Sequence, residues 1–143
     1  MYTVEPEDFA LIDFVRKNLD SFLSYFNETG DFSVTFVSDD EIRNLNREYR
    51  NIDSPTDILT FRLADGEDDF PSPEGEEMEL GDIFISLESM RRNASEFGVD
   101  ENDELRRLLL HGLMHLRGWD HRTNDFTSEP MLIEQERILK EIR

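Results

Sequence analysis

All three histidines of the 143-residue chain lie close together, at positions 111, 115 and 121. His111 and His115 are four residues apart in a segment with helical periodicity, so their imidazoles project from one helix face, one turn apart. Gly118 can adopt the left-handed conformation that ends a helix, after which His121 can supply a third nitrogen. Three imidazoles that leave a fourth position for water are the ligand set of a catalytic zinc. The spacing therefore predicts one zinc ion per chain, held by these three catalytic histidines.

The same segment matches the His-Glu-x-x-His-x-x-Gly-x-x-His pattern of metzincin peptidases at every position but one. Gly112 stands where those peptidases carry the glutamate that takes a proton from the attacking water. The absence of this carboxylate counts against peptide hydrolysis. It also means that there is less negative charge beside the ion than in those peptidases. That change suits an anionic substrate such as a phosphodiester. A zinc hydrolase of amides or small molecules is the alternative within enzyme chemistry.

The spacing of apolar residues predicts five helices and three strands around this segment. The helices cover residues 8–26, 38–50, 87–97, 102–116 and 127–142, and the strands cover residues 32–37, 57–63 and 80–86. Ser38 and Glu41 have the spacing of a capping box. Residues 65–79 include eight acidic side chains and no basic one, which predicts an exposed, flexible loop. These elements indicate one α+β domain over residues 1–143, with a small mixed sheet covered by about five helices.

The composition excludes several classes of protein. The chain contains no cysteine, so it has no disulfide partner, no thiolate zinc site and no cysteine nucleophile. No apolar run approaches the roughly 20 residues that a membrane-spanning helix needs. The N-terminal residues lack the basic and apolar regions of a secretory signal. We therefore expect a cytoplasmic protein that does not engage a membrane.

The charge is strongly negative but unevenly distributed. A net charge of −19, from 34 acidic and 15 basic residues, argues against nonspecific binding to nucleic acid. Residues 43–62 nevertheless carry +1, from four arginines and three acidic residues, and residues 89–123 balance six arginines with six acidic residues. Arginine, whose planar fork suits phosphate and carboxylate, outnumbers lysine throughout the chain. The two segments that hold the candidate chemistry are therefore the least acidic.

Three segments resemble the YbeY family of bacterial rRNA maturation factors. They are residues 45–61, whose sequence ends in Asp-Ser-Pro-Thr-Asp-Ile-Leu-Thr-Phe, residues 80–83, which read Leu-Gly-Asp-Ile, and the histidine segment, residues 111–121. They occur in the order typical of the family, with a variable loop between the first and the second. The chain departs from the family at Trp119, where tyrosine is usual, and at Arg62, where proline is common. Its variable loop is also unusually acidic.

This resemblance implies a zincin-like fold and a single-strand-specific, metal-dependent endoribonuclease. The implied roles are 16S rRNA 3′-end maturation and ribosome quality control, with single-stranded RNA, 16S rRNA and the ribosomal small subunit with its proteins as partners. The metal ligands of the family map onto His111, His115 and His121, and its functionally important arginine maps onto Arg50. The alternative outside enzyme chemistry is a ribosome-assembly factor in which the metal only stabilises the fold.

Four further side chains are candidates for supporting roles. Arg50 could neutralise charge that develops on a phosphoryl oxygen, or could interact only with the dipole of its own helix. Asp57 and Asp120 could each orient a ligand or a water, or could serve as turn residues. Asp82 lies in an otherwise apolar strand, where an unpaired carboxylate is costly to bury. It could hold a loop or a ligand, or could lie at a sheet edge.

Overall fold

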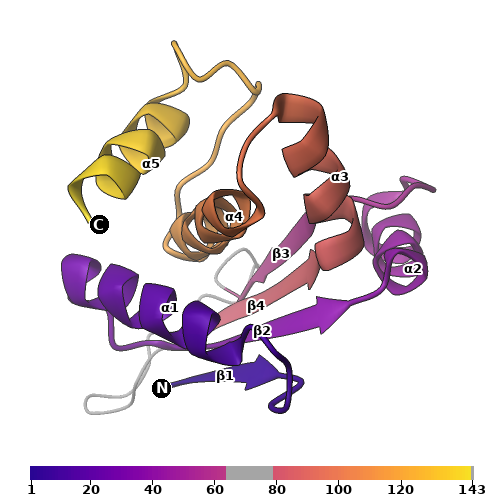
Figure 1. The fold of residues 1–143 in the computed structure, drawn as a ribbon, viewed down its shortest axis with the longest axis horizontal. Coiled ribbons are helices and arrows are strands. Elements are labelled where there is room, and N and C mark those ends of the chain that lie inside the picture. Colours follow the sequence, from indigo (N-terminus) through magenta and orange to yellow (C-terminus); the bar gives the residue numbers. More distant parts are fainter. Residues whose placement is uncertain (64–78, 143) are drawn as a thin grey trace.

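The computed structural model describes residues 1–63 and 79–142. Within these residues, four strands form one sheet and five helices pack around it (Figure 1). The elements in chain order are β1 (Tyr2–Glu5), α1 (Ile12–Phe26), β2 (Asp31–Val37), α2 (Asp39–Arg50), β3 (Ile58–Arg62), β4 (Glu79–Ser86), α3 (Leu87–Phe97), α4 (Glu101–Leu116) and α5 (Pro130–Glu141). The predicted α+β class is confirmed. The acidic segment predicted as a flexible loop lies outside the described residues, except for Glu79.

The sheet is mixed, with the strand order β1-β2-β4-β3. β1 and β4 each run parallel to β2, whereas β3 runs antiparallel to β4. Along β4, Ile83 and Ile85 are fully buried, so Asp82 projects from the opposite face of the sheet. The Asp82 carboxylate accepts a hydrogen bond of 2.6 Å from the Ser33 hydroxyl on β2. Because β4 lies between two other strands, the sheet-edge alternative for Asp82 is wrong.

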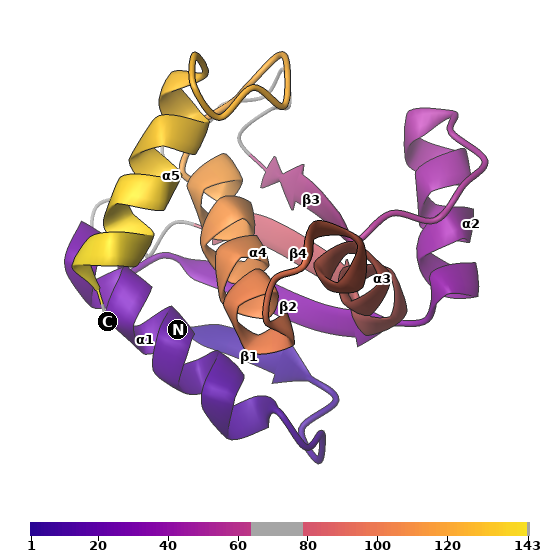
Figure 2. The same cartoon turned by 45° about the horizontal axis from the view of Figure 1, so that its top comes forward.

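Helix α4 lies over the middle of the sheet, between α1 and α3 (Figure 2). It is buried on nearly all sides, because it packs on the sheet below and against α1, α3 and α5 around it. Gly112 brings the helix close to the sheet: a Cβ atom there would lie 3.0 Å from a terminal methyl of Ile58 and of Ile83. None of the helices formed by the described residues has the length and apolarity needed to span a membrane.

Most predicted boundaries agree with the structure, and the exceptions have local causes. α1 begins at Ile12 rather than near residue 8, because Phe9 sits in a preceding turn and stacks on Phe36 of β2 at 4.5 Å between ring centroids. α5 begins at Pro130 rather than near residue 127, since proline is favoured in the first turn of a helix. β1 was not predicted: it has four residues, and only Val4 is buried.

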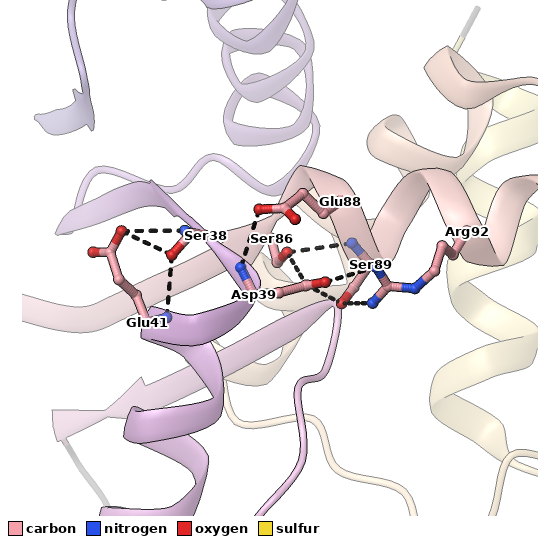
Figure 3. A network of polar contacts seen from close by, with 7 residues as sticks. All are labelled: Ser38, Asp39, Glu41, Ser86, Glu88, Ser89 and Arg92. Atoms are coloured by element: carbon pink, nitrogen blue, oxygen red, sulfur yellow. Dashed lines mark hydrogen bonds and ion pairs between the residues drawn. The ribbon is translucent and has the colours of Figure 1, made fainter.

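The start of α2 is bonded to the start of α3 through Asp39 (Figure 3). Its carboxylate accepts hydrogen bonds of 2.6 Å each from the Ser86 hydroxyl, the Ser89 hydroxyl and the Arg92 guanidinium. Burial alone would raise the pKa of Asp39, but these three donors outweigh it and lower the pKa to about 2. The predicted capping box between Ser38 and Glu41 is present beside this network.

We expect Asp39→Asn to destabilise the fold by about 1–2 kcal/mol at pH 7, because it weakens the bond to Arg92 and leaves hydroxyl donors poorly matched. The pKa of Asp39 is depressed on folding, so its stabilisation is complete above the pKa of an unfolded aspartate and is lost as the pH falls toward 2. Urea denaturation of both proteins across this range measures the effect. Asp40→Asn, on the exposed side of the same helix turn, is the matched control. Equal effects of the two substitutions would contradict the expectation.

Candidate metal centre

The three histidines meet at the C-terminal end of α4. His111 and His115 project from the last two turns of the helix, and Gly118, with a φ of 103°, turns the chain so that His121 returns to them. One ring nitrogen from each residue can be chosen such that all three lie within 4.8 Å of one another. The Nε2 atoms of His111 and His115 are 3.1 Å apart. The structure thus brings together the three residues that the spacing predicted as neighbours.

The other nitrogen of each ring contacts an oxygen acceptor. Nδ1 of His111 lies 2.7 Å from Oε1 of Gln135, and Nδ1 of His115 lies 3.0 Å from the carbonyl oxygen of Trp119. Nδ1 of His121 lies 2.8 Å from the carbonyl oxygen of Thr123. An amide or peptide oxygen can only accept, so in the neutral rings each Nδ1 carries the proton and each Nε2 presents a lone pair. All three rings are therefore held in the tautomer that can bind a metal ion through Nε2.

The electrostatic environment also favours neutral rings. Burial, followed by the neighbouring histidines, lowers the pKa of His111 to about 4. Burial and then His121 lower the pKa of His115 as well. Both rings are consequently neutral at pH 7, which is the protonation state that coordinates metals.

The donor geometry fits a metal ion. Two unprotonated nitrogens 3.1 Å apart cannot hydrogen-bond to each other, and a shared cation would satisfy the lone pairs of both His111 and His115. Two nitrogens bound to one tetrahedral zinc at the usual bond length are separated by about 3.3 Å. The three histidines could therefore hold a metal ion with little rearrangement.

Arg50 lies next to this cluster. It ends α2, and its Nη2 donates a hydrogen bond of 2.8 Å to the carbonyl oxygen of Thr60 on β3. Its guanidinium also stacks over the ring of Phe61, with 5.3 Å from Cζ to the ring centroid. Arg50 and His115 line the same small cavity. The tertiary structure thus directs Arg50 toward the histidines across the edge of the sheet, which a purely helix-dipole role would not require.

The other predicted candidates have structural contacts. Asp57 accepts a hydrogen bond from the side-chain amide of Asn93 on α3, and burial raises its pKa. It interacts electrostatically with Glu104, which lies two turns before His111 on α4.

Asp120 accepts a hydrogen bond of 2.9 Å from the backbone N–H of His121, and its carboxylate is 4.0 Å from Nδ1 of His115. Asp120 therefore shapes the histidine turn, whereas Asp57 lies toward the other end of α4.

Sequence reasoning missed Gln135. Its side chain is buried between α5 and α4. Of the three Nδ1 acceptors, it is the one that comes from a different helix, since Trp119 and Thr123 lie in the turn after α4. The signal was a polar residue within the otherwise apolar stripe of the last helix, whose buried members are Met131, Leu132, Gln135, Ile138 and Leu139. A buried amide at such a position needs a hydrogen-bonding partner, but the sequence does not say which one.

Comparison with known proteins places the chain in a family. The family model described as Endoribonuclease YbeY matches residues 3–143. The chain belongs to the YbeY family. Endoribonuclease YbeY of Treponema denticola is 44% identical over 110 residues, which cover 77% of this chain and 70% of that protein. Endoribonuclease YbeY of Symbiobacterium thermophilum is 48% identical over 107 residues, covering 75% of this chain and 68% of that protein.

A solved structure supports the same YbeY-type fold. The solution structure of TM1509 from Thermotoga maritima superposes with a TM-score of 0.64 and 29% sequence identity. The superposition covers 99% of this chain and 89% of that one. The similarity is therefore not confined to the three sequence segments, and it includes the arrangement of the described helices and strands.

Proposed function

We propose that this chain is a zinc-dependent endoribonuclease that cleaves single-stranded RNA. The observation that carries the proposal is the convergence of the three histidines, with every Nδ1 engaged by an oxygen acceptor and the Nε2 atoms left to bind one ion. The relatives named Endoribonuclease YbeY support RNA as the substrate. The proposed ligands are His111, His115 and His121, and the proposed phosphate-binding residue is Arg50.

The side chains have distinct proposed roles. A zinc ion in this site supplies Lewis-acid chemistry, which activates water and withdraws charge from a phosphoryl oxygen. His111, His115 and His121 would hold the ion. Arg50, anchored by Thr60, binds a non-bridging oxygen of the phosphodiester and stabilises the charge that develops there.

A peptide substrate is disfavoured by the position of Gly112. The glycine faces the sheet, where a Cβ atom would lie 3.0 Å from a terminal methyl of Ile58 and of Ile83. A glutamate at this position would have to displace these two side chains and would start toward the sheet, which counts against a general base there.

The proposed cellular role is 16S rRNA 3′-end maturation and ribosome quality control in the cytoplasm. The strongly acidic chain has little general affinity for RNA, since phosphate attraction needs a positive surface. We therefore propose that the ribosomal small subunit and its proteins bring the enzyme to its substrate.

Assays of the purified chain on three substrates test the reaction. Zinc-loaded protein is expected to cleave a labelled single-stranded RNA, to spare the same RNA in a duplex, and to leave a labelled peptide intact. His111→Ala, purified in parallel, is the control for contaminating nuclease. Peptide cleavage that requires His111, without RNA cleavage, would establish the amide-hydrolase alternative. If chelation unfolds the chain while RNA cleavage never exceeds the control, the metal has a structural role in an assembly factor.

The contact between Gln135 and His111 makes a separate prediction. Gln135→Leu keeps the buried volume but removes the acceptor for Nδ1, so we expect zinc affinity to fall about 10- to 100-fold. Competition with a chromogenic chelator measures the affinity. Gln135→Glu retains an oxygen acceptor and is expected to bind zinc within a few fold of the unmodified protein. Unchanged affinity in Gln135→Leu would show that Gln135 does not orient the ring.

A further inference from the structure

An exposed tyrosine lies beside the arginine that the proposed function assigns to phosphate. Tyr49 precedes Arg50 in the last turn of α2, and it is 61% exposed. Both side chains pack on the same ring, that of Phe61 on β3. The centroid of this ring is 5.4 Å from the centroid of Tyr49 and 5.3 Å from Cζ of Arg50. Because both distances end at one point, the Tyr49 ring and the guanidinium carbon are separated by no more than their sum.

The contact with Phe61 supports the Tyr49 ring and leaves part of it open. The planes of the two rings are inclined by 71°, which is an edge-to-face arrangement. Such a contact covers an edge or one face of a ring, so the other face of the exposed Tyr49 ring is accessible to a planar ligand. Phe61 is itself backed by Phe84 of β4, with 5.8 Å between ring centroids. Tyr49 is therefore a supported aromatic platform beside Arg50.

The pair of side chains matches the two parts of a nucleotide. A nucleotide joins a phosphate and a planar base through one sugar, and a guanidinium suits the phosphate whereas an aromatic ring suits the base. Bases of single-stranded RNA can turn outward and stack on tyrosine, but bases in a duplex are held by their own pairing and stacking. Stacking on a ring does not require a positive surface, so it also suits a chain with a net charge of −19.

We propose that Tyr49 stacks on the base of the nucleotide whose phosphate Arg50 binds. Tyr49 is then a specificity-determining residue, because it accepts only a base that is free to leave the stack of its own strand, and so favours single-stranded RNA over a duplex. This inference rests on the proposed function for the nature of the ligand. Its own content is the stacking contact, which binding measures separately from cleavage.

Binding of a labelled single-stranded RNA decamer to the zinc-loaded chain tests the contact. Stopped-flow anisotropy gives the Kd before turnover. Tyr49→Leu keeps an apolar side chain next to Phe61 but removes the aromatic face, and it is expected to raise the Kd about tenfold. Tyr49→Phe keeps the ring and should leave the Kd within twofold. Phe97→Leu makes the matched change at a residue that is 69% exposed at the end of α3, and it should also leave the Kd within twofold.

An abasic nucleotide separates stacking from a general loss of affinity. When each base of the decamer is removed in turn, one position should weaken binding to the unmodified protein about tenfold, but weaken binding to Tyr49→Leu less than twofold. The duplex of the same sequence is the second comparison. Its Kd should not change in Tyr49→Leu, so the preference for the single strand should fall about tenfold. Zinc content and the free energy of unfolding should stay the same, because Tyr49 is exposed.

The outcomes distinguish this inference from the proposed function. If Tyr49→Leu and the unmodified protein have equal Kd values for the decamer, or if neither binds it detectably, stacking on Tyr49 is wrong even when RNA is cleaved. Abasic sensitivity that persists in Tyr49→Leu also overturns it. If that sensitivity disappears in Trp119→Leu instead, the base stacks on Trp119, the exposed ring that lines a cavity with Arg50. If the unmodified protein cleaves no RNA but loses abasic sensitivity in Tyr49→Leu, stacking is supported and the endoribonuclease proposal fails.

Discussion

Purified His115→Ala is expected to contain no stoichiometric zinc and to have lost RNA cleavage. Removing one of three nitrogen ligands should lower zinc affinity on the order of a thousandfold or more, because two histidines cannot hold the ion against water. The fold should survive, since the side chain lies at the end of α4 and is partly exposed. Elemental analysis after dialysis and a single-turnover cleavage assay measure the two losses.

Asp120→Asn is the matched control for this experiment. It changes a carboxylate 4.0 Å from Nδ1 of His115 but keeps all three imidazoles, so one zinc per chain should remain. The result that would contradict the site is a His115→Ala protein that still binds one zinc with unchanged affinity. Loss of zinc with full retention of RNA cleavage would contradict the metal-dependent reaction while leaving the metal site in place.

Arg50→Ala is expected to lower kcat for RNA cleavage about 100- to 1000-fold without changing zinc content. The reason is the loss of a positive charge placed to stabilise the phosphoryl oxygens in the transition state. Because Arg50 is exposed and its bond is to a carbonyl at the sheet edge, the free energy of unfolding should change little. Single-turnover rates at saturating RNA, with zinc measured in the same preparation, test this expectation.

Two variants define what Arg50 contributes. Arg47→Ala removes an exposed arginine of the same helix that pairs with Asp53, and it should retain the unmodified rate. Arg50→Lys keeps the charge but loses the planar fork, so its rate should lie between those of the unmodified protein and Arg50→Ala. A fall in rate that only matches a fall in zinc content would show that Arg50 acts through the fold. An unchanged rate would remove Arg50 from the reaction.

The helices were largely predictable because their signals are local. Ser38 and Glu41 formed the capping box that their spacing indicated, and the helix at residues 87–97 was predicted with the bounds that the structure has. β1 was missed because a short strand with one buried residue carries no alternating pattern. Its place beside β2 depends on parallel pairing with residues about thirty positions away, which no local pattern encodes.

The histidine cluster was predictable because it depends on local helix geometry. The contacts around it were not, because they depend on long-range packing. Residues four apart on a helix share a face whatever surrounds them, and Gly118 permits the return of the chain to His121, so the sequence alone indicated which side chains meet. The Nδ1 partner of His111 is 24 positions away on α5, and it becomes a partner only when α5 packs on α4.

The arginine-lined side of the candidate site was decided by tertiary structure alone. Arg50 and Arg62 come from different elements, and they line one cavity because the end of α2, the edge strand β3 and the turn after α4 meet there. Two arginines twelve positions apart have no fixed relation until long-range packing sets one, since the free chain samples many separations. The sequence by itself thus determined the candidate metal-binding set, through helix geometry, whereas only the packing of the sheet edge against α4 decided which charges lie beside it.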